Sequence, residues 1–171
     1  MMKFIGAICI LLTTTWIGFE ASRKYSERSS QLRLLKSALQ SLEAEIMFGH
    51  TPLHEASRRI AKQIRKPLSL LFSTFAEKLV QRDTTVKDAW TESLQEIWKY
   101  TALKETEFEI MSQVGETLGK HDQFQQQKQI LLAITHLERE EIEAREKQLT
   151  VGKMMKSLGF LSGLFIIIML L

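Results

Sequence analysis

The sequence predicts an all-α protein, a six-helix bundle flanked by two hydrophobic anchor helices. Ala, Leu, Glu, Lys, Gln and Arg dominate, and these residues favour helices. Only two prolines occur, Pro52 and Pro67. No segment alternates polar and apolar residues with period two for the length of a strand. A chain of 171 residues has room for one domain and two short anchors.

Two uncharged apolar runs lie at the ends of the chain, from Phe4 to Phe19 and from Ser157 to Leu171. Sixteen helical residues rise about 24 Å against a hydrocarbon core of about 30 Å, so each run needs flanking residues to span a bilayer. The runs predict an N-terminal membrane anchor over 1–22, a helical bundle over 23–150 and a C-terminal membrane anchor over 151–171.

Basic residues flank both runs on the side of the middle domain, which predicts that this domain is cytoplasmic and both termini lie outside. Only Lys3 precedes the first run, and nothing basic follows the second. The inner flanks carry Arg23, Lys24, Arg28, Arg33 and Lys36, and Arg145, Lys147, Lys153 and Lys156. Two alternatives stay open. The first run can be a cleaved signal peptide, and the second can be a hairpin end or an interfacial helix.

Six apolar stripes with helical spacing predict the bundle. The first is the most regular, because its residues repeat at intervals of 3, 4, 3 and 4. The stripes are Leu32, Leu35, Leu39, Leu42 and Ile46; Leu53, Ala56, Ile60 and Ile64; Leu68, Leu71, Phe72, Phe75 and Leu79; Val86, Trp90, Leu94 and Ile97; Phe108, Met111, Val114 and Leu118; and Ile130, Leu131, Ile134 and Leu137.

Turn and cap residues separate the stripes. Thr51 is expected to cap the second helix with Pro52 at its first position, and Pro67 to open the third. The segment 83–85 is expected to form a turn and cap before the fourth helix. Gly119 is expected to end the fifth helix, and Asp122 to cap the sixth with Gln125 at its third position.

No constellation of catalytic residues is evident, so we predict a protein that is not an enzyme and that has no cofactor, metal or nucleic-acid partner. His50 and His54 are four residues apart, but a helix start at Thr51-Pro52 separates them, which disfavours a metal site. The sequence has no phosphate-binding glycine loop and no nucleophile motif. The carboxylates are expected to be spread over helix surfaces. A net charge of +3 is too small to indicate a polyanionic partner.

An acidic ridge is the one surface pattern that indicates a partner. Glu105, Glu109, Ser112 and Glu116 repeat at intervals of 4, 3 and 4, roughly opposite the stripe that begins with Phe108. The ridge is either a solvated face or a docking surface for a basic partner. On the second interpretation Glu105, Glu109 and Glu116 are the partner-binding residues.

Five stretches spread along nearly the whole chain carry a resemblance to a known family. They are Thr14-Thr15-Trp16-Ile17-Gly18-Phe19-Glu20, residues 42–53 (LEAEIMFGHTPL), 115–122 (GETLGKHD), 135–140 (THLERE) and 156–161 (KSLGFL). These stretches resemble the stage III sporulation protein AB family of endospore-forming bacteria. Ser29 stands where that family is expected to have proline.

The Gly115-Glu116-Thr117-Leu118-Gly119 turn also resembles the Gly-Glu-x-x-Gly turn of the F-domain in type II secretion systems. These resemblances imply a non-enzymatic membrane subunit of a channel or secretion-like complex between mother cell and forespore, on the mother-cell side. They imply docking of a stage III sporulation AA-type ATPase, contact with other membrane subunits and with lipid, and a possible homodimer. The alternative is a purely structural membrane-anchored helical protein without ATPase contact.

Overall fold

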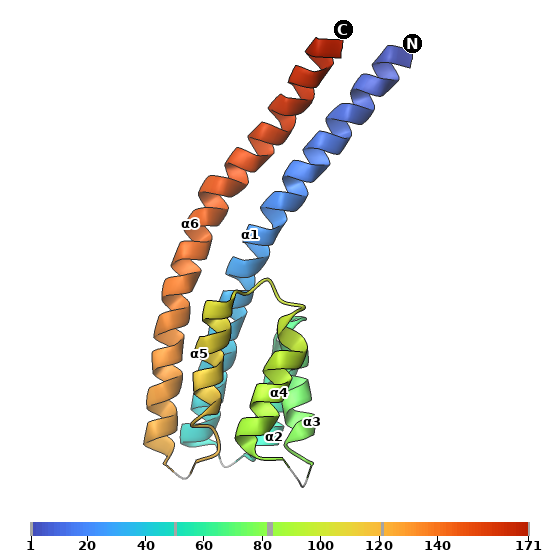
Figure 1. Ribbon diagram of the computed structural model, residues 1–171. Coiled ribbons are helices and arrows are strands. Elements are labelled where there is room, and N and C mark those ends of the chain that lie inside the picture. Colours follow the sequence, from blue (N-terminus) through green and yellow to red (C-terminus); the bar gives the residue numbers. More distant parts are fainter. Residues whose placement is uncertain (1, 50, 82–83, 121, 171) are drawn as a thin grey trace. The chain divides into compact units, whose positions relative to one another are not determined.

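The computed structural model describes residues 2–49, 51–81, 84–120 and 122–170, and most side chains before Tyr25 and after Val151 are outside this description. The described chain is helical and contains no strand (Figure 1). The helices are α1 (Met2–Phe48), α2 (Leu53–Gln63), α3 (Leu68–Lys78), α4 (Val86–Trp98), α5 (Glu105–Gly115) and α6 (Gln123–Leu170). The predicted all-α fold with six helices is therefore confirmed for the described residues.

The chain divides into two compact units, which we call the stem unit and the bundle unit. The stem unit comprises Met1–Ser29 and Ile142–Leu171, and the bundle unit comprises Ser30–Glu141. Within the stem unit, the first part of α1 and the last part of α6 run side by side (Figure 1). The amide Nε2 of Gln148 donates a hydrogen bond of 3.3 Å to the hydroxyl of Ser26 there.

Most residues of the predicted stripes lie in the core of the bundle unit. The first four residues of the α1 stripe are fully buried, and Ile46 is half-buried. Burial of a Leu side chain is worth about 1.5–3 kcal/mol, so these four positions contribute strongly to bundle stability. The other large, fully buried side chains that the structure describes in this unit include Ile60, Leu68, Leu71, Phe72, Phe75, Trp90, Leu94, Met111, Ile130 and Leu137.

Two predicted caps are confirmed. The hydroxyl of Thr85 accepts a hydrogen bond of 3.1 Å from the backbone N–H of Asp88 at the start of α4. A carboxylate oxygen of Asp122 accepts one of 3.1 Å from the backbone N–H of Gln125 at the start of α6. Each cap satisfies a donor that a helix start leaves without an intrahelical partner.

Other predicted boundaries are wrong. Helix α2 begins at Leu53, because Pro52 has an extended ψ of 143° and takes the cap position itself. Helix α5 ends at Gly115 rather than at Gly119, and a turn follows it. The apolar end runs are not separate flanking helices but continue into α1 and α6, because neither proline nor glycine interrupts residues 19–48 or 120–151.

The predicted inward position of Leu131 is also wrong. This side chain is 47% exposed, whereas Ile130, Ala133 and Leu137 are buried on the same helix. The buried residues follow intervals of 3 and 4, which leaves Leu131 on a different face. In a segment rich in apolar residues, the sequence alone does not show which of two adjacent residues faces the core.

Candidate protein-interaction surfaces

The acidic ridge lies on α5, whose opposite face packs on α4. Trp90 of α4 is fully buried, and its indole N–H donates a hydrogen bond of 2.7 Å to the carbonyl oxygen of Met111. Phe72 and Phe75 meet the indole edge-on, with centroid distances of 5.9 and 4.9 Å. Such aromatic pairs add about 0.5–1.5 kcal/mol to the effect of burial. Trp90 therefore fixes how α5 sits on α4 and in which direction the ridge faces.

The two glycines of the 115–119 segment have separate structural roles. A Cβ on Gly115 would overlap Cδ1 of Trp90 and lie 3.1 Å from its Cγ, so only glycine lets α5 approach the indole this closely. Gly119 has a φ of +79°, in the left-handed region where glycine is unstrained. A Cβ there would also lie 2.7 Å from a methyl carbon of Val86. The segment is thus shaped by contact with α4.

The side chain of Gln126 holds the same turn from α6. This residue is 6% exposed. Its amide oxygen accepts a hydrogen bond of 3.2 Å from the backbone N–H of Gly119, and its amide nitrogen donates to the carbonyl oxygen of Lys120. These bonds satisfy two backbone groups that the end of α5 leaves outside a helix. Gln126 was not predicted, because nothing in this glutamine-rich segment distinguishes it from its neighbours.

The structure places Glu105, Glu109 and Ser112 on one side of α5 and Glu116 at its C-cap. Glu105, Glu109 and Glu116 are exposed, and Ser112 is half-buried. Glu107, between the first two, is fully buried, which corrects the expectation that every carboxylate lies on a surface. A carboxylate oxygen of Glu107 accepts a hydrogen bond of 2.6 Å from the backbone N–H of Lys104, so this acid serves the start of α5.

The three ridge glutamates differ in their electrostatic surroundings. Glu116 lies 2.8 Å from the Nζ of Lys87 on α4. The hydrogen bond to Glu116, together with its charge, raises the pKa of Lys87 above its ordinary value. Glu105 and Glu109 form no ion pair with any residue that the structure describes. These two glutamates are therefore the acids of the ridge that are available to a partner.

A second charged surface lies on α2 and the turn after it, and the sequence-based prediction did not include it. The residues Arg58, Arg59, Lys62, Arg65 and Lys66 are all exposed. Arg59 lies 3.1 Å from a carboxylate oxygen of Glu45, whereas the other four form no ion pair within the described chain. The signal was present in the sequence, since five of the nine residues from 58 to 66 are basic. Arg58, Arg59 and Lys62 lie on α2 and form what we call the basic face of α2, and Arg65 and Lys66 follow the end of the helix at Gln63.

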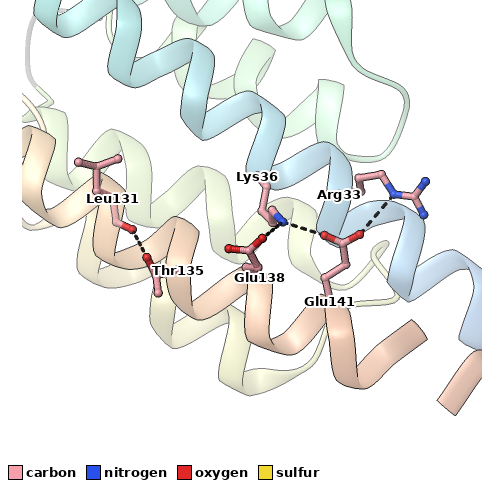
Figure 2. Close-up of polar contacts among 6 residues, drawn as sticks. All are labelled: Arg33, Lys36, Leu131, Thr135, Glu138 and Glu141. Atoms are coloured by element: carbon pink, nitrogen blue, oxygen red, sulfur yellow. Dashed lines mark hydrogen bonds and ion pairs between the residues drawn. The ribbon is translucent and has the colours of Figure 1, made fainter. Parts of the chain in front are cut away.

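A polar cluster joins α1 to α6 within the bundle unit (Figure 2). The Nζ of Lys36 lies 2.9 Å from Glu141 and 3.4 Å from Glu138, and the Nε of Arg33 lies 3.4 Å from Glu141. Partial burial by itself would lower the pKa of Lys36, but the hydrogen bonds and charges of the two glutamates outweigh it, and the pKa is raised. The cluster is structural, because both of its central side chains are mostly buried.

The described residues contain no group of three His, Cys, Asp or Glu side chains that could hold a metal ion. His54 is half-buried at the start of α2. His50, which lies four residues before His54 in the sequence, is outside the described residues. The expected absence of metal, cofactor and catalysis stays a prediction.

The membrane prediction rests mainly on residues whose side chains are not described. Among the residues that the structure does describe, no helix holds an apolar stretch long enough to cross a membrane. The side chains of Cys9, Lys24, Lys153 and Lys156 lie outside the description. The anchors over 1–22 and 151–171, and the topology inferred from their flanks, stay predictions.

The fold and its surfaces define a helical-bundle protein with two charged faces of opposite sign. The family model of stage III sporulation protein AB matches residues 3–171. The chain belongs to this family, which confirms the predicted resemblance to it and a role in sporulation, whereas the resemblance to a type II secretion F-domain stays a prediction. It is 52% identical over 171 residues to stage III sporulation protein AB of Bacillus subtilis (strain 168), covering 100% of both chains. A solved structure of stage III sporulation protein AB, also 52% identical, matches with a TM-score of 0.70 over 72% of this chain and 98% of that chain.

Proposed function

We propose that this chain is a non-enzymatic membrane platform or adaptor subunit of a sporulation channel or secretion-like complex between mother cell and forespore. Residues 1–22 and 151–171 anchor it in the membrane, and residues 23–150 lie in the mother-cell cytoplasm. The cytoplasmic part docks a motor ATPase of the stage III sporulation AA type, and the anchors contact other membrane subunits of the complex. Membership of the sporulation family, the apolar end runs and their basic inner flanks support this proposal.

The observation that carries the docking step is the presence of two acids without partners on a rigid helix face. Glu105 and Glu109 are exposed and form no ion pair within the described chain. Their helix is fixed on its other side by the packing of Trp90 against Met111 and Gly115. A charged surface held in one orientation suits electrostatic recognition of a basic partner surface, which accelerates association and sets register.

Glu116 has a smaller role in this proposal than the other two ridge acids. Its ion pair with Lys87 already neutralises it, and both side chains of that pair are 55% exposed. A partner lysine or arginine would have to compete with Lys87. We therefore assign the main docking contact to Glu105 and Glu109, and a marginal contact to Glu116.

The test compares binding of the purified ATPase to the full chain and to charge-reversed variants at low and moderate salt. Glu105→Lys/Glu109→Lys should weaken binding about tenfold at low salt, and the difference should shrink as salt screens the charges. Glu77→Lys/Glu146→Lys is the matched control, since both residues are exposed and without an ion pair in the described chain. Unchanged binding by a folded ridge variant, or equal weakening by the control, would contradict docking through the ridge.

The alternative, a structural membrane protein without ATPase contact, makes a different prediction in the same assay. On that view the unmodified chain shows no saturable binding to the ATPase at any salt concentration. The ion pair between Glu116 and Lys87 favours this alternative, because one acid of the ridge already has a partner within the chain. Saturable binding that the ridge variant weakens selectively would exclude it.

A further inference from the structure

The outward face of α2 carries two cations, Arg58 and Lys62, that form no ion pair within the described chain. The inward face of this helix is Ala56, Ser57 and Ile60, all buried. Arg58 and Lys62 are exposed on the opposite side and form no ion pair with a described residue. A helix face with several unpaired like charges is destabilised by their repulsion and gains from a partner of opposite sign.

The same chain carries a face of opposite sign. Helix α2 holds three basic residues and one acidic residue, whereas the segment 105–116 holds three exposed acidic residues and no basic one. Within the bundle unit, α2 contacts α3, α3 contacts α4, and α4 contacts α5. The two faces belong to the helices at the two ends of this series, and no ion pair joins them in the described chain. The two faces do not pair with each other within the described chain, but they can pair between two copies.

The spacing of the unpaired charges matches between the two faces. Arg58 and Lys62 are four residues apart on α2, and Glu105 and Glu109 are four residues apart on α5. Four helical residues rise about 6 Å, so both pairs present their charges at the same separation. Two ion contacts can therefore form in a single register between α2 of one copy and α5 of another.

We propose that the occupant of the basic face is a second copy of this chain, which places its acidic ridge on α2. Because the two surfaces differ, the contact is heterologous and leaves one basic face and one ridge free at the ends of any open array. Self-association thus competes with a motor for the ridge, and in an open array only the terminal copy presents Glu105 and Glu109. The self-association itself does not depend on the proposed motor docking.

The contact is weak between freely diffusing molecules. Each helix has 11 residues, about 16 Å of length, so a single pair of helix faces buries less than a stable interface requires. Confinement of many copies to one membrane surface would raise their effective concentration, which makes a weak contact sufficient for assembly. The assay must therefore use the full chain at high concentration or on a membrane.

The test is a charge-swap experiment on the full chain in mild detergent, measured by sedimentation at low and moderate salt. Arg58→Glu/Lys62→Glu and Glu105→Lys/Glu109→Lys should each raise the dissociation constant about tenfold. A mixture of the two variants should associate again, because each supplies the charge that the other has lost. The matched controls Lys128→Glu/Arg139→Glu and Glu77→Lys/Glu146→Lys reverse charges on exposed sites elsewhere and should sediment like the unmodified chain.

Three results would overturn the proposal. The first is unchanged association of both folded variants, and the second is failure of their mixture to associate. The third is a result in which Arg58→Glu/Lys62→Glu no longer binds vesicles of anionic lipid but still self-associates. That result would show that the basic face binds a membrane. Arg58→Glu/Lys62→Glu retains the ridge and should still bind the ATPase. Binding of this variant to the ATPase therefore tests the proposed motor docking separately from self-association.

Discussion

Replacement of Gly115 by alanine tests the packing that fixes the ridge. The added Cβ would overlap Cδ1 of Trp90, which is fully buried and cannot move outward without losing contact with Phe72 and Phe75. Overpacking of this kind costs about 1–3 kcal/mol. Displacement of the indole would also weaken its 2.7 Å hydrogen bond to Met111, a further cost of about 0.5–1.5 kcal/mol.

The higher helix propensity of alanine opposes the destabilisation that Gly115→Ala causes by overpacking. Alanine is about 1 kcal/mol more favourable than glycine in a helix interior, and the gain is smaller at the last residue of a helix, where Gly115 lies. We therefore expect a net loss of about 1–3 kcal/mol in the free energy of unfolding. In a chain of this size this corresponds to a decrease in melting temperature of roughly 2–12 °C.

The assay is thermal and urea unfolding of the full chain, followed by far-ultraviolet circular dichroism, with Gln113→Ala as a control at an exposed site on the same helix. The control should change stability by no more than about 0.5 kcal/mol. Combining Gly115→Ala with Trp90→Phe should cost less than the sum of the two single changes, because the smaller ring leaves space for the Cβ. A Gly115→Ala variant as stable as the unmodified chain, or more stable, would refute this reasoning.

Three further predictions address the core, the polar cluster and the topology. Leu39→Ala should lower the free energy of unfolding by about 2–5 kcal/mol, because Leu39 is fully buried in the α1 stripe; a loss below 1 kcal/mol in urea unfolding would contradict a central position. Lys36→Met should lower the free energy of unfolding by about 1–2 kcal/mol below pH 10. The pKa of Lys36 is raised in the folded state, so its stabilising contribution is complete below the ordinary value of 10.5 and is lost as pH rises through the folded-state pKa. The difference in stability between the variant and the unmodified chain should therefore narrow above about pH 10.5. In a Cys9→Ser background, single cysteines at Gln81 and Gln113 should resist a membrane-impermeant thiol reagent in intact cells, and labelling of either would contradict a cytoplasmic bundle.

The parts of the fold that the sequence predicts correctly are those fixed by short-range patterns. Leu32, Leu35, Leu39 and Leu42 share one helix face through their spacing alone, and all four are buried. The caps at Thr85 and Asp122 depend on a side chain and a backbone N–H three residues later. Such features involve only neighbouring residues, so a single sequence contains all the information they need.

Most of the features that the sequence did not predict depend on residues far apart in the chain. Glu107 appears in the sequence as one more acid of an acidic helix, and its hydrogen bond to the backbone N–H of Lys104 is local, but its burial depends on the packing of α5 in the bundle. The pairing of Glu116 with Lys87, 29 positions away, requires the packing of α5 on α4. The sequence therefore predicts one part of the candidate site and not the other. The position of the ridge follows from periodicity, but which of its acids are unpaired follows only from tertiary contacts.

The two charged faces can act as specific surfaces only if their helices are held rigidly, and the structure shows how α5 is held. Gly115 allows close approach to Trp90, and Gln126 binds the turn around Gly119 from α6. A flexible ridge would lose part of its electrostatic gain to the entropy of ordering on binding. Gly115→Ala should therefore weaken partner binding even at temperatures where the chain remains folded, although this change alters no charge. Binding that is unaffected by Gly115→Ala but abolished by Glu105→Lys/Glu109→Lys would show that charge alone, without fixed orientation, is sufficient for recognition.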